Sequence, residues 1–156
     1  NGLAYGYKYY DDETHGSVPL ISTYDALKHI FKFYDLRLTM EDNMNFSRNT
    51  ITKVENHYKE VSKHFGANYL APELMINQLG YMAMGNKKME EAEYLFKMNV
   101  TNYPTSLNVY DSMGDFYAAK GEKDKAIENY KKALAIREFP VTRTKLDALM
   151  KQVPAK

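Results

Sequence analysis

A histidine stands in an acidic turn near the start of the chain, in the stretch Tyr-Tyr-Asp-Asp-Glu-Thr-His-Gly-Ser-Val-Pro-Leu at residues 9–20. A histidine can take a proton from a serine hydroxyl and return it to a leaving group, which is general acid–base chemistry. That chemistry needs an activated nucleophile, and no Gly-x-Ser-x-Gly elbow occurs in the sequence. We therefore expect His15 to be a solvated loop residue in this chain by itself.

The other histidines and the cysteine count argue against a metal centre. His57 and His64 lie seven residues apart on one predicted helix, whereas metal-binding pairs on helices prefer a spacing of about four. The sequence has no cysteine, which excludes disulfides, thiolate metal sites and cysteine nucleophiles. We predict no metal site and no cofactor.

Composition and charge narrow the classes of partner. The 156 residues carry 21 Lys and Arg against 20 Asp and Glu, which gives a formal net charge of +1. This balance does not favour nucleic acid, and no apolar run approaches the roughly 18 residues of a membrane span. No signal peptide is visible and the first residue is Asn1, so we interpret the sequence as part of a longer protein.

A spacing of 34 residues repeats in the second half of the sequence. The residue pairs at this offset are Gly80 and Gly114, Ala92 and Ala126, and Phe96 and Tyr130. This period and order of residue types resemble the tetratricopeptide repeat, whose units are pairs of antiparallel helices. Each glycine would let a neighbouring side chain reach the first helix, and each alanine would lie where the two helices cross. We predict repeats at about 73–102 and 106–137.

Helices on both sides are expected to cover the apolar ends of the repeats. Downstream, residues 141–152 form a pattern with one apolar side, which predicts a capping helix. Upstream, Thr52 and Glu55 fit a capping box at a helix start, and Gly66 fits a helix stop. The result would be six helices in a right-handed stack.

The first 36 residues predict a different structure. Residues 3–10 alternate tyrosine and leucine with smaller or charged residues, which is typical of a strand. Ser17 and Pro19 mark the start of a helix after the His15 loop. A strand, a loop and a helix in this order form one unit of an α/β sheet. The predicted organisation is an α/β remnant over 1–36, a polar linker over 37–48 and a mainly α domain of antiparallel helix pairs over 49–156.

The first segment resembles the closing part of bacterial putative esterases related to enterochelin esterase, which are α/β-hydrolases. The residues that carry the resemblance are His-Gly-Ser-Val-Pro-Leu at 15–20 and Tyr-Asp-Ala-Leu at 24–27. It extends over nearly the whole chain, because many of these esterases carry a repeat-like tail. The resemblance implies that His15 is the base of a Ser-His-Asp triad in the intact parent. It also implies a bacterial origin, without deciding between periplasm and cytoplasm.

Tetratricopeptide arrays generally bind extended peptides along the first helix of each unit. The residues expected to face that groove are Asn77, Tyr81, Met84, Asn108, Asp111 and Asp115. No lysine or arginine stands at these positions, and the two acids would repel an acidic peptide. A ligand of this groove is therefore expected to be a basic or polar peptide.

Three functions remain open at this point. The first is the C-terminal helical region of a serine esterase, not catalytic by itself, which acts in packing, association or substrate access beside the parent hydrolase domain. The second is an independent peptide-binding scaffold, and the third is a structural appendage that only stabilises or dimerises the enzyme. The unpaired edge of the strand over 3–10 also predicts a homodimer. A nucleophile elbow upstream would support the first function, and further 34-residue units would support the second.

Overall fold

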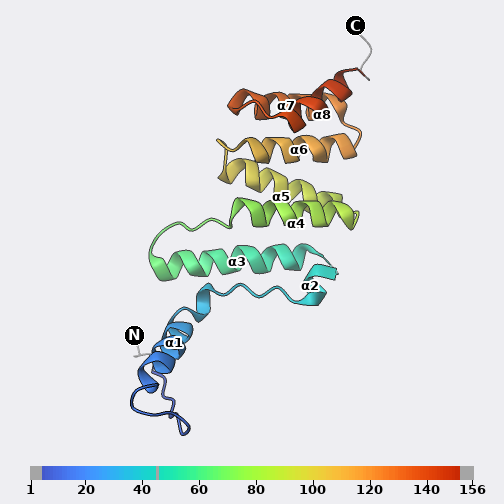
Figure 1. Ribbon diagram of the computed structural model, residues 1–156. Coiled ribbons are helices and arrows are strands. Elements are labelled where there is room, and N and C mark those ends of the chain that lie inside the picture. Colours follow the sequence, from blue (N-terminus) through green and yellow to red (C-terminus); the bar gives the residue numbers. More distant parts are fainter. Residues whose placement is uncertain (1–4, 45, 152–156) are drawn as a thin grey trace. The chain divides into compact units, whose positions relative to one another are not determined.

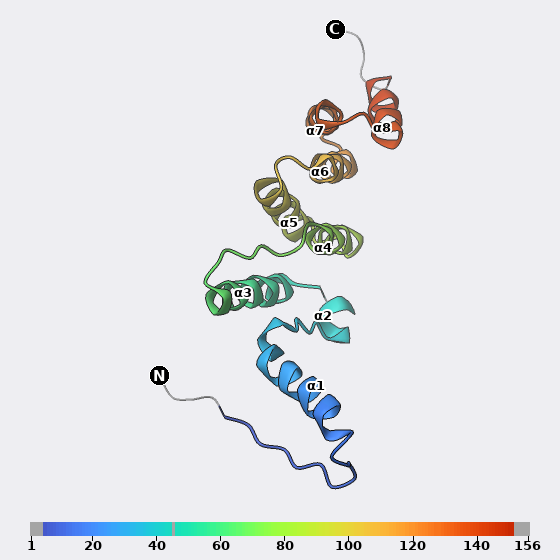
Figure 2. The same cartoon turned by 60° about the vertical axis from the view of Figure 1, so that its left-hand side comes forward.

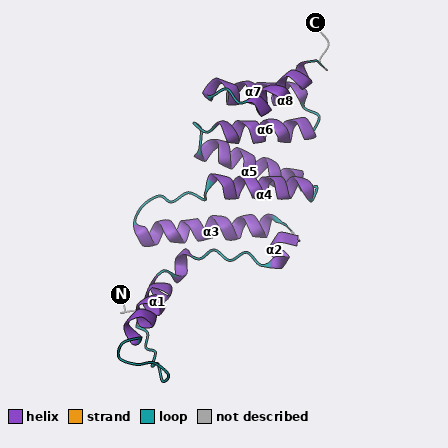
Figure 3. Cartoon of the chain, viewed as in Figure 1, coloured by secondary structure: helices purple, strands orange, loops and turns teal. Residues whose placement is uncertain are grey.

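The computed structural model describes residues 5–44 and 46–151. These residues form eight α-helices and one short 3-10 helix, and no strand occurs among them (Figures 1 and 3). The chain divides into two compact units, Asn1–Leu36 and Arg37–Lys156. The prediction that the protein is mainly α is therefore confirmed. Position 152, the last of the predicted capping helix, lies outside the described residues.

The first unit contains an extended segment, a turn and helix α1, Val18–Ile30. Ser17 at the N-cap and Pro19 in the first turn match the predicted helix start. Residues 5–10 form neither helix nor strand, because no second strand pairs with them in the part of the chain that the structure describes. The predicted strand is thus not formed there, and the rest of it lies outside the described residues.

Asp25 of α1 holds the extended segment against the helix. Its carboxylate accepts a hydrogen bond of 2.9 Å from the hydroxyl of Tyr10 and pairs with the ammonium group of Lys8. The apolar side of α1 remains open, since no residue of this helix is buried. Leu20 is 79% exposed and Ile30 is 59% exposed. Among residues 5–36, polar contacts rather than a buried apolar core join the extended segment to the helix.

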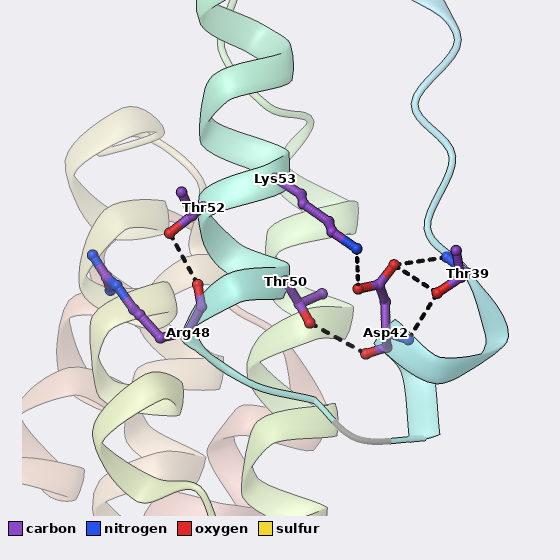
Figure 4. Close-up of polar contacts among 6 residues, drawn as sticks. All are labelled: Thr39, Asp42, Arg48, Thr50, Thr52 and Lys53. Carbon is purple, nitrogen blue, oxygen red and sulfur yellow. Dashed lines mark hydrogen bonds and ion pairs between the residues drawn. The ribbon is translucent and has the colours of Figure 1, made fainter.

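The second unit begins with a short helix inside the predicted linker, α2, Met40–Met44. The backbone N–H of Thr39 donates to Oδ2 of Asp42 at 2.9 Å, and the N–H of Asp42 donates to Oγ1 of Thr39 at 3.1 Å (Figure 4). This reciprocal arrangement is a capping box. Lys53 of helix α3, Arg48–Phe65, pairs with Oδ1 of Asp42 at 2.6 Å (Figure 4). The linker is therefore fastened to the helix that follows it.

Helix α3 begins at Arg48, ahead of the predicted capping box, so that prediction is wrong. The hydroxyl of Thr52 donates to the carbonyl oxygen of Arg48 at 3.0 Å, within the helix (Figure 4). A threonine can bond the carbonyl one turn back when the helix already extends past it. The predicted stop is confirmed, because Gly66 ends α3 with a φ of 64° in the left-handed region.

Four helices follow as two hairpins whose boundaries repeat. They are α4, Glu73–Gly85, with α5, Met89–Asn102, and α6, Leu107–Ala119, with α7, Lys123–Ile136. Each boundary of the second hairpin lies 34 residues after the corresponding boundary of the first. The turns correspond as well, since Lys87 and Gly121 have positive φ angles of 60° and 80°. The repeat in sequence is therefore also a repeat in backbone geometry.

The two glycines of the repeat have equivalent surroundings. A Cβ atom placed on Gly80 would lie 2.7 Å from the ring of Phe96, and one on Gly114 would lie 2.4 Å from the ring of Tyr130. Side-chain carbons do not approach so closely, so glycine is what permits the second helix of each hairpin to pack against the first. This role of the glycines was predicted, and it is confirmed.

Helix α8, Pro140–Met150, follows the second hairpin and packs against α7 (Figures 1 and 2). Val109 and Met113 are buried in α6. The residues 34 positions further on are Arg143 and Asp147, and both are exposed on α8. A helix at the end of a helical array needs such a polar outer face. Arg143 and Asp147 therefore make this part of the surface of α8 polar where the corresponding part of α6 is apolar and buried.

Candidate functional site

His15 is exposed and lies in the turn that precedes α1. The turn is held by Thr14 and Ser17, because the N–H of Thr14 donates to Oγ of Ser17 at 3.0 Å and the N–H of Ser17 donates to the carbonyl of Thr14 at 3.0 Å. The hydroxyl of Ser17 is engaged with Thr14. Within the described ranges, no hydrogen bond joins His15 to another residue. The nearest serine in sequence is thus a turn residue and not a partner of the histidine.

The remaining histidines do not gather into a metal centre. His57 stacks edge-on against Tyr58 with ring centroids 5.0 Å apart, and His64 is exposed near the end of the same helix. The described part of the chain holds no group of three or more His, Cys, Asp or Glu side chains placed to bind a metal ion. None of its helices is long and apolar enough to cross a membrane.

The second unit, which we call the helical unit, contains a polar cluster built from side chains of four helices. Its members are Tyr81 of α4, Asp111 and Asp115 of α6, Tyr130 of α7, and Thr142 and Lys145 of α8. Tyr81, Asp111 and Asp115 are three of the six residues predicted to face the groove. The structure brings these three together and adds donors from α7 and α8.

Asp115 is the acceptor that most of the polar cluster shares. Its Oδ1 accepts from the hydroxyl of Tyr130 at 2.7 Å. Its Oδ2 accepts from the hydroxyl of Tyr81 at 2.7 Å and from Nζ of Lys145 at 2.8 Å. A carboxylate offers about four acceptor positions, so three of those on Asp115 are already used.

Asp111 is bonded in a similar way. The hydroxyl of Thr142 donates to its Oδ1 at 2.6 Å, and Nζ of Lys145 donates to its Oδ2 at 2.8 Å. Lys145 therefore bridges both acids with a side chain that is only 29% exposed. The expectation of a basic ligand depended on two unpaired carboxylates, and both have partners within the chain.

No match comes from models of known protein families, and none comes from curated proteins. The chemistry of the polar cluster is therefore judged by its own contacts. Lys145, Thr142 and Tyr130 were missed as site residues at the level of sequence. A signal for Lys145 was present, because it stands 34 residues after Asp111 and has the opposite charge.

The ionisation of the polar cluster follows from its burial. Burial raises the pKa of Tyr81 and of Tyr130, and the hydrogen bonds to Asp115 raise both further. Burial lowers the pKa of Lys145, but its bonds to Asp111 and Asp115 outweigh this and leave the pKa above its ordinary value. Near neutral pH the polar cluster thus holds the ammonium group of Lys145 and the neutral phenols of Tyr81 and Tyr130.

The other three predicted groove residues are not bonded to the polar cluster. The amide of Asn108 donates to Oε1 of Glu73 at 2.9 Å, and Met84 is half-buried. Asn77 is 8% exposed, and its Oδ1 has no hydrogen-bond partner among the described residues. A buried polar atom without a partner costs about 1–3 kcal/mol. Asn77 is therefore a position on α4 where a hydrogen bond remains to be made.

Proposed function

We propose that this chain is the closing part of an esterase-like serine hydrolase, whose helical unit acts in association or substrate access and not in catalysis. The observation that carries the proposal is the open apolar side of α1. An amphipathic helix in a protein gains most of its stability by packing that side against other elements. On α1 the exposed apolar residues are Leu20, Tyr24, Leu27 and Ile30. An adjoining hydrolase domain would cover them.

In this proposal His15 is the general base of the parent enzyme. An exposed ring in a turn held at Thr14 and Ser17 is suited to reach a serine from another part of the protein. The serine, the acid and the oxyanion hole belong to the parent domain. The helical unit is a tetratricopeptide-like, right-handed stack, which the matching boundaries of its two hairpins support.

The test compares the intact parent protein with the chain alone. The parent should hydrolyse a p-nitrophenyl ester, and His15→Gln should lower its kcat by more than about 1,000-fold. His64→Gln, an exposed histidine of the helical unit, should leave the rate unchanged. The chain alone should give no turnover above background. His15-dependent hydrolysis by the chain alone, or an unchanged rate in the parent variant, would refute the proposal.

A second candidate, an independent peptide-binding scaffold, is favoured by Asn77. The unpartnered amide oxygen is buried, so an extended peptide lying along α4 and α6 would have to displace neighbouring side chains to donate a backbone N–H to it. A peptide selected for binding to the chain should then lose at least about tenfold in affinity with Asn77→Ala. Asn86→Ala is the control, because Asn86 already donates to the carbonyl of Met82 at 2.9 Å. Equal losses in both variants would count against the scaffold.

Pairing of two copies is a further proposal for the first unit. Tyr5 and Tyr7 are 79% and 78% exposed, so the segment predicted to pair is open to a partner. Sedimentation velocity should reveal a dimer that dissociates on dilution, and Tyr7→Lys should shift it to monomer. A monomer at every concentration would exclude this association.

A further inference from the structure

A pocket of about 400 Å³ opens between α3, the connection from α3 to α4, and the α4–α5 hairpin. Its volume lies toward the lower end of the range of about 300–1,000 Å³ that small-molecule sites occupy. No member of the polar cluster lines it. The pocket is therefore a separate place on the helical unit that can hold a ligand.

The floor of the pocket belongs to the apolar core. Ile51 and Val54 come from α3, Ile76 from α4 and Leu95 from α5, and none of these residues is more than 2% exposed. Their carbon atoms offer no hydrogen bond, so a charged or polar group placed there would be destabilised. The part of a ligand that lies against these four residues is therefore expected to be hydrocarbon.

One wall of the pocket is the connection between α3 and α4, and it is held at both ends. The N–H of Tyr69 donates to Oγ of Ser62 at 2.9 Å, and the hydroxyl of Tyr103 donates to the carbonyl of Ala71 at 2.8 Å. These bonds fix the wall before a ligand arrives. Less conformational freedom is then lost on binding.

The mouth of the pocket carries polar groups with bonding capacity left. Lys59 forms no ion pair with a described residue, and the side-chain amides of Asn68 and Asn102 form no hydrogen bond within the described ranges. Glu55 also lines the mouth, but its carboxylate accepts from the hydroxyl of Tyr94. An ammonium without a counter-ion and two amide N–H donors favour a negatively charged oxygen group.

We propose that this pocket binds a medium-chain carboxylate, with the alkyl chain on the apolar floor and the carboxylate at Lys59, Asn68 and Asn102. An alcohol of the same chain length shares only the apolar part of this recognition. An alkyl ammonium ion brings a like charge to Lys59, which disfavours it there, and would have to bind at Glu55, whose Oε1 already accepts from Tyr94. The inference is independent of the proposed hydrolase function, because it involves neither His15 nor the parent domain.

The test uses octanoate, with octanol and octyltrimethylammonium as head-group controls, and follows the amide chemical shifts of the full chain. Octanoate should shift residues of α3, α5 and the connection, and should bind at least about tenfold more tightly than either control. Lys59→Met should remove this preference and leave octanol binding unchanged. Lys63→Met is the matched control, since Lys63 lies one turn further on and pairs with Glu60 at 3.8 Å.

The result that would overturn the proposal is equally specific. Equal affinity for octanoate and octanol, or no saturable shift at the pocket residues, would exclude carboxylate recognition there. Met98→Phe places a larger side chain in the pocket and should weaken octanoate and octanol alike, with circular dichroism to verify the fold. If neither variant changes binding, the ligand lies elsewhere and the proposal fails.

Discussion

Tyr81 and Asp115 stand 34 residues apart, at equivalent positions of the two hairpins, and the hydroxyl of Tyr81 donates to Oδ2 of Asp115 at 2.7 Å. Asp111 and Lys145 have the same separation in sequence and are joined at 2.8 Å. In a helical array, equivalent positions of neighbouring units face each other, so a sequence period becomes a line of contacts between helices. The polar cluster thus ties α4, α6 and α8 together.

The first prediction concerns the centre of that cluster. Asp115→Ala removes the acceptor of the Tyr81 and Tyr130 hydroxyls, which are partly buried, and leaves Lys145 paired with Asp111 alone. We expect the free energy of unfolding to fall by about 2–4 kcal/mol, measured by urea denaturation. Tyr81→Phe removes a single hydrogen bond and should cost about 1 kcal/mol.

A surface ion pair provides the control for this experiment. Glu128 and Lys132 of α7 pair at 2.7 Å, and both side chains are more than half exposed. Exposed pairs of this kind contribute about 0–1 kcal/mol, so Glu128→Ala should change stability little. If Asp115→Ala lowers the free energy of unfolding no more than Glu128→Ala does, the polar cluster does not stabilise the packing of these helices.

The second prediction concerns the glycines of the repeat. Gly114→Ala would place a Cβ atom 2.4 Å from the ring of Tyr130, so the ring or the helix must move. Overpacking of this kind costs about 1–3 kcal/mol, measured as a fall in the free energy of unfolding. Gly85→Ala is the control, because a Cβ there would meet no atom within 4 Å. The control should be neutral or stabilising, by about 0.5–1 kcal/mol.

The two hairpins could be predicted from the sequence because the residues that recur every 34 positions also determine how the two helices of each hairpin pack. Gly80 and Gly114 each admit an aromatic ring of the second helix, so the same residue types recur wherever that packing recurs. Lys145 could not be assigned in this way. Its helix lacks the glycine and aromatic residues of the repeat, and its bond to Asp111 depends on how α8 packs against α7.

The helix starts illustrate a second limit of local patterns. Thr52 and Glu55 have the spacing of a capping box, yet they lie inside α3. Thr39 and Asp42 have the same spacing and do cap α2, where Lys53 binds the carboxylate from another helix. The spacing in sequence is the same in both places, but only Thr39 and Asp42 form a cap, and there a side chain of another helix contacts the carboxylate.

The third prediction concerns the turn of the first hairpin. Lys87 has a φ of 60°, whereas the equivalent position of the second hairpin is Gly121 with a φ of 80°. A side chain in the left-handed region costs about 1–2 kcal/mol, which glycine avoids. Lys87→Gly should therefore raise the free energy of unfolding by up to about 1 kcal/mol, after the greater flexibility of unfolded glycine is deducted. Gly121→Lys should do the reverse, and a lower Tm for Lys87→Gly would contradict the equivalence of the turns.

The last prediction concerns the acid stability of the helical unit. The hydrogen bond from Lys53, with the two from Thr39, lowers the pKa of Asp42 from 3.8 to about 2. Because the folded state holds the carboxylate more acidic than the unfolded state does, the ionised group stabilises the fold above about pH 4. That contribution is lost as the pH falls from about 4 to about 2. Asp42→Asn should therefore lose stability at pH 7 but little more between pH 4 and pH 2, measured as urea midpoints by circular dichroism.

Lys53→Met checks the cause of this effect. It removes the donor that lowers the pKa of Asp42 most, and it leaves the two hydrogen bonds from Thr39 in place. The loss of stability of Lys53→Met between pH 4 and pH 2 should therefore be smaller than that of the unsubstituted protein and larger than that of Asp42→Asn. If all three proteins lose stability equally over this range, another carboxylate controls the acid transition, and the contact between the linker and α3 does not contribute to it.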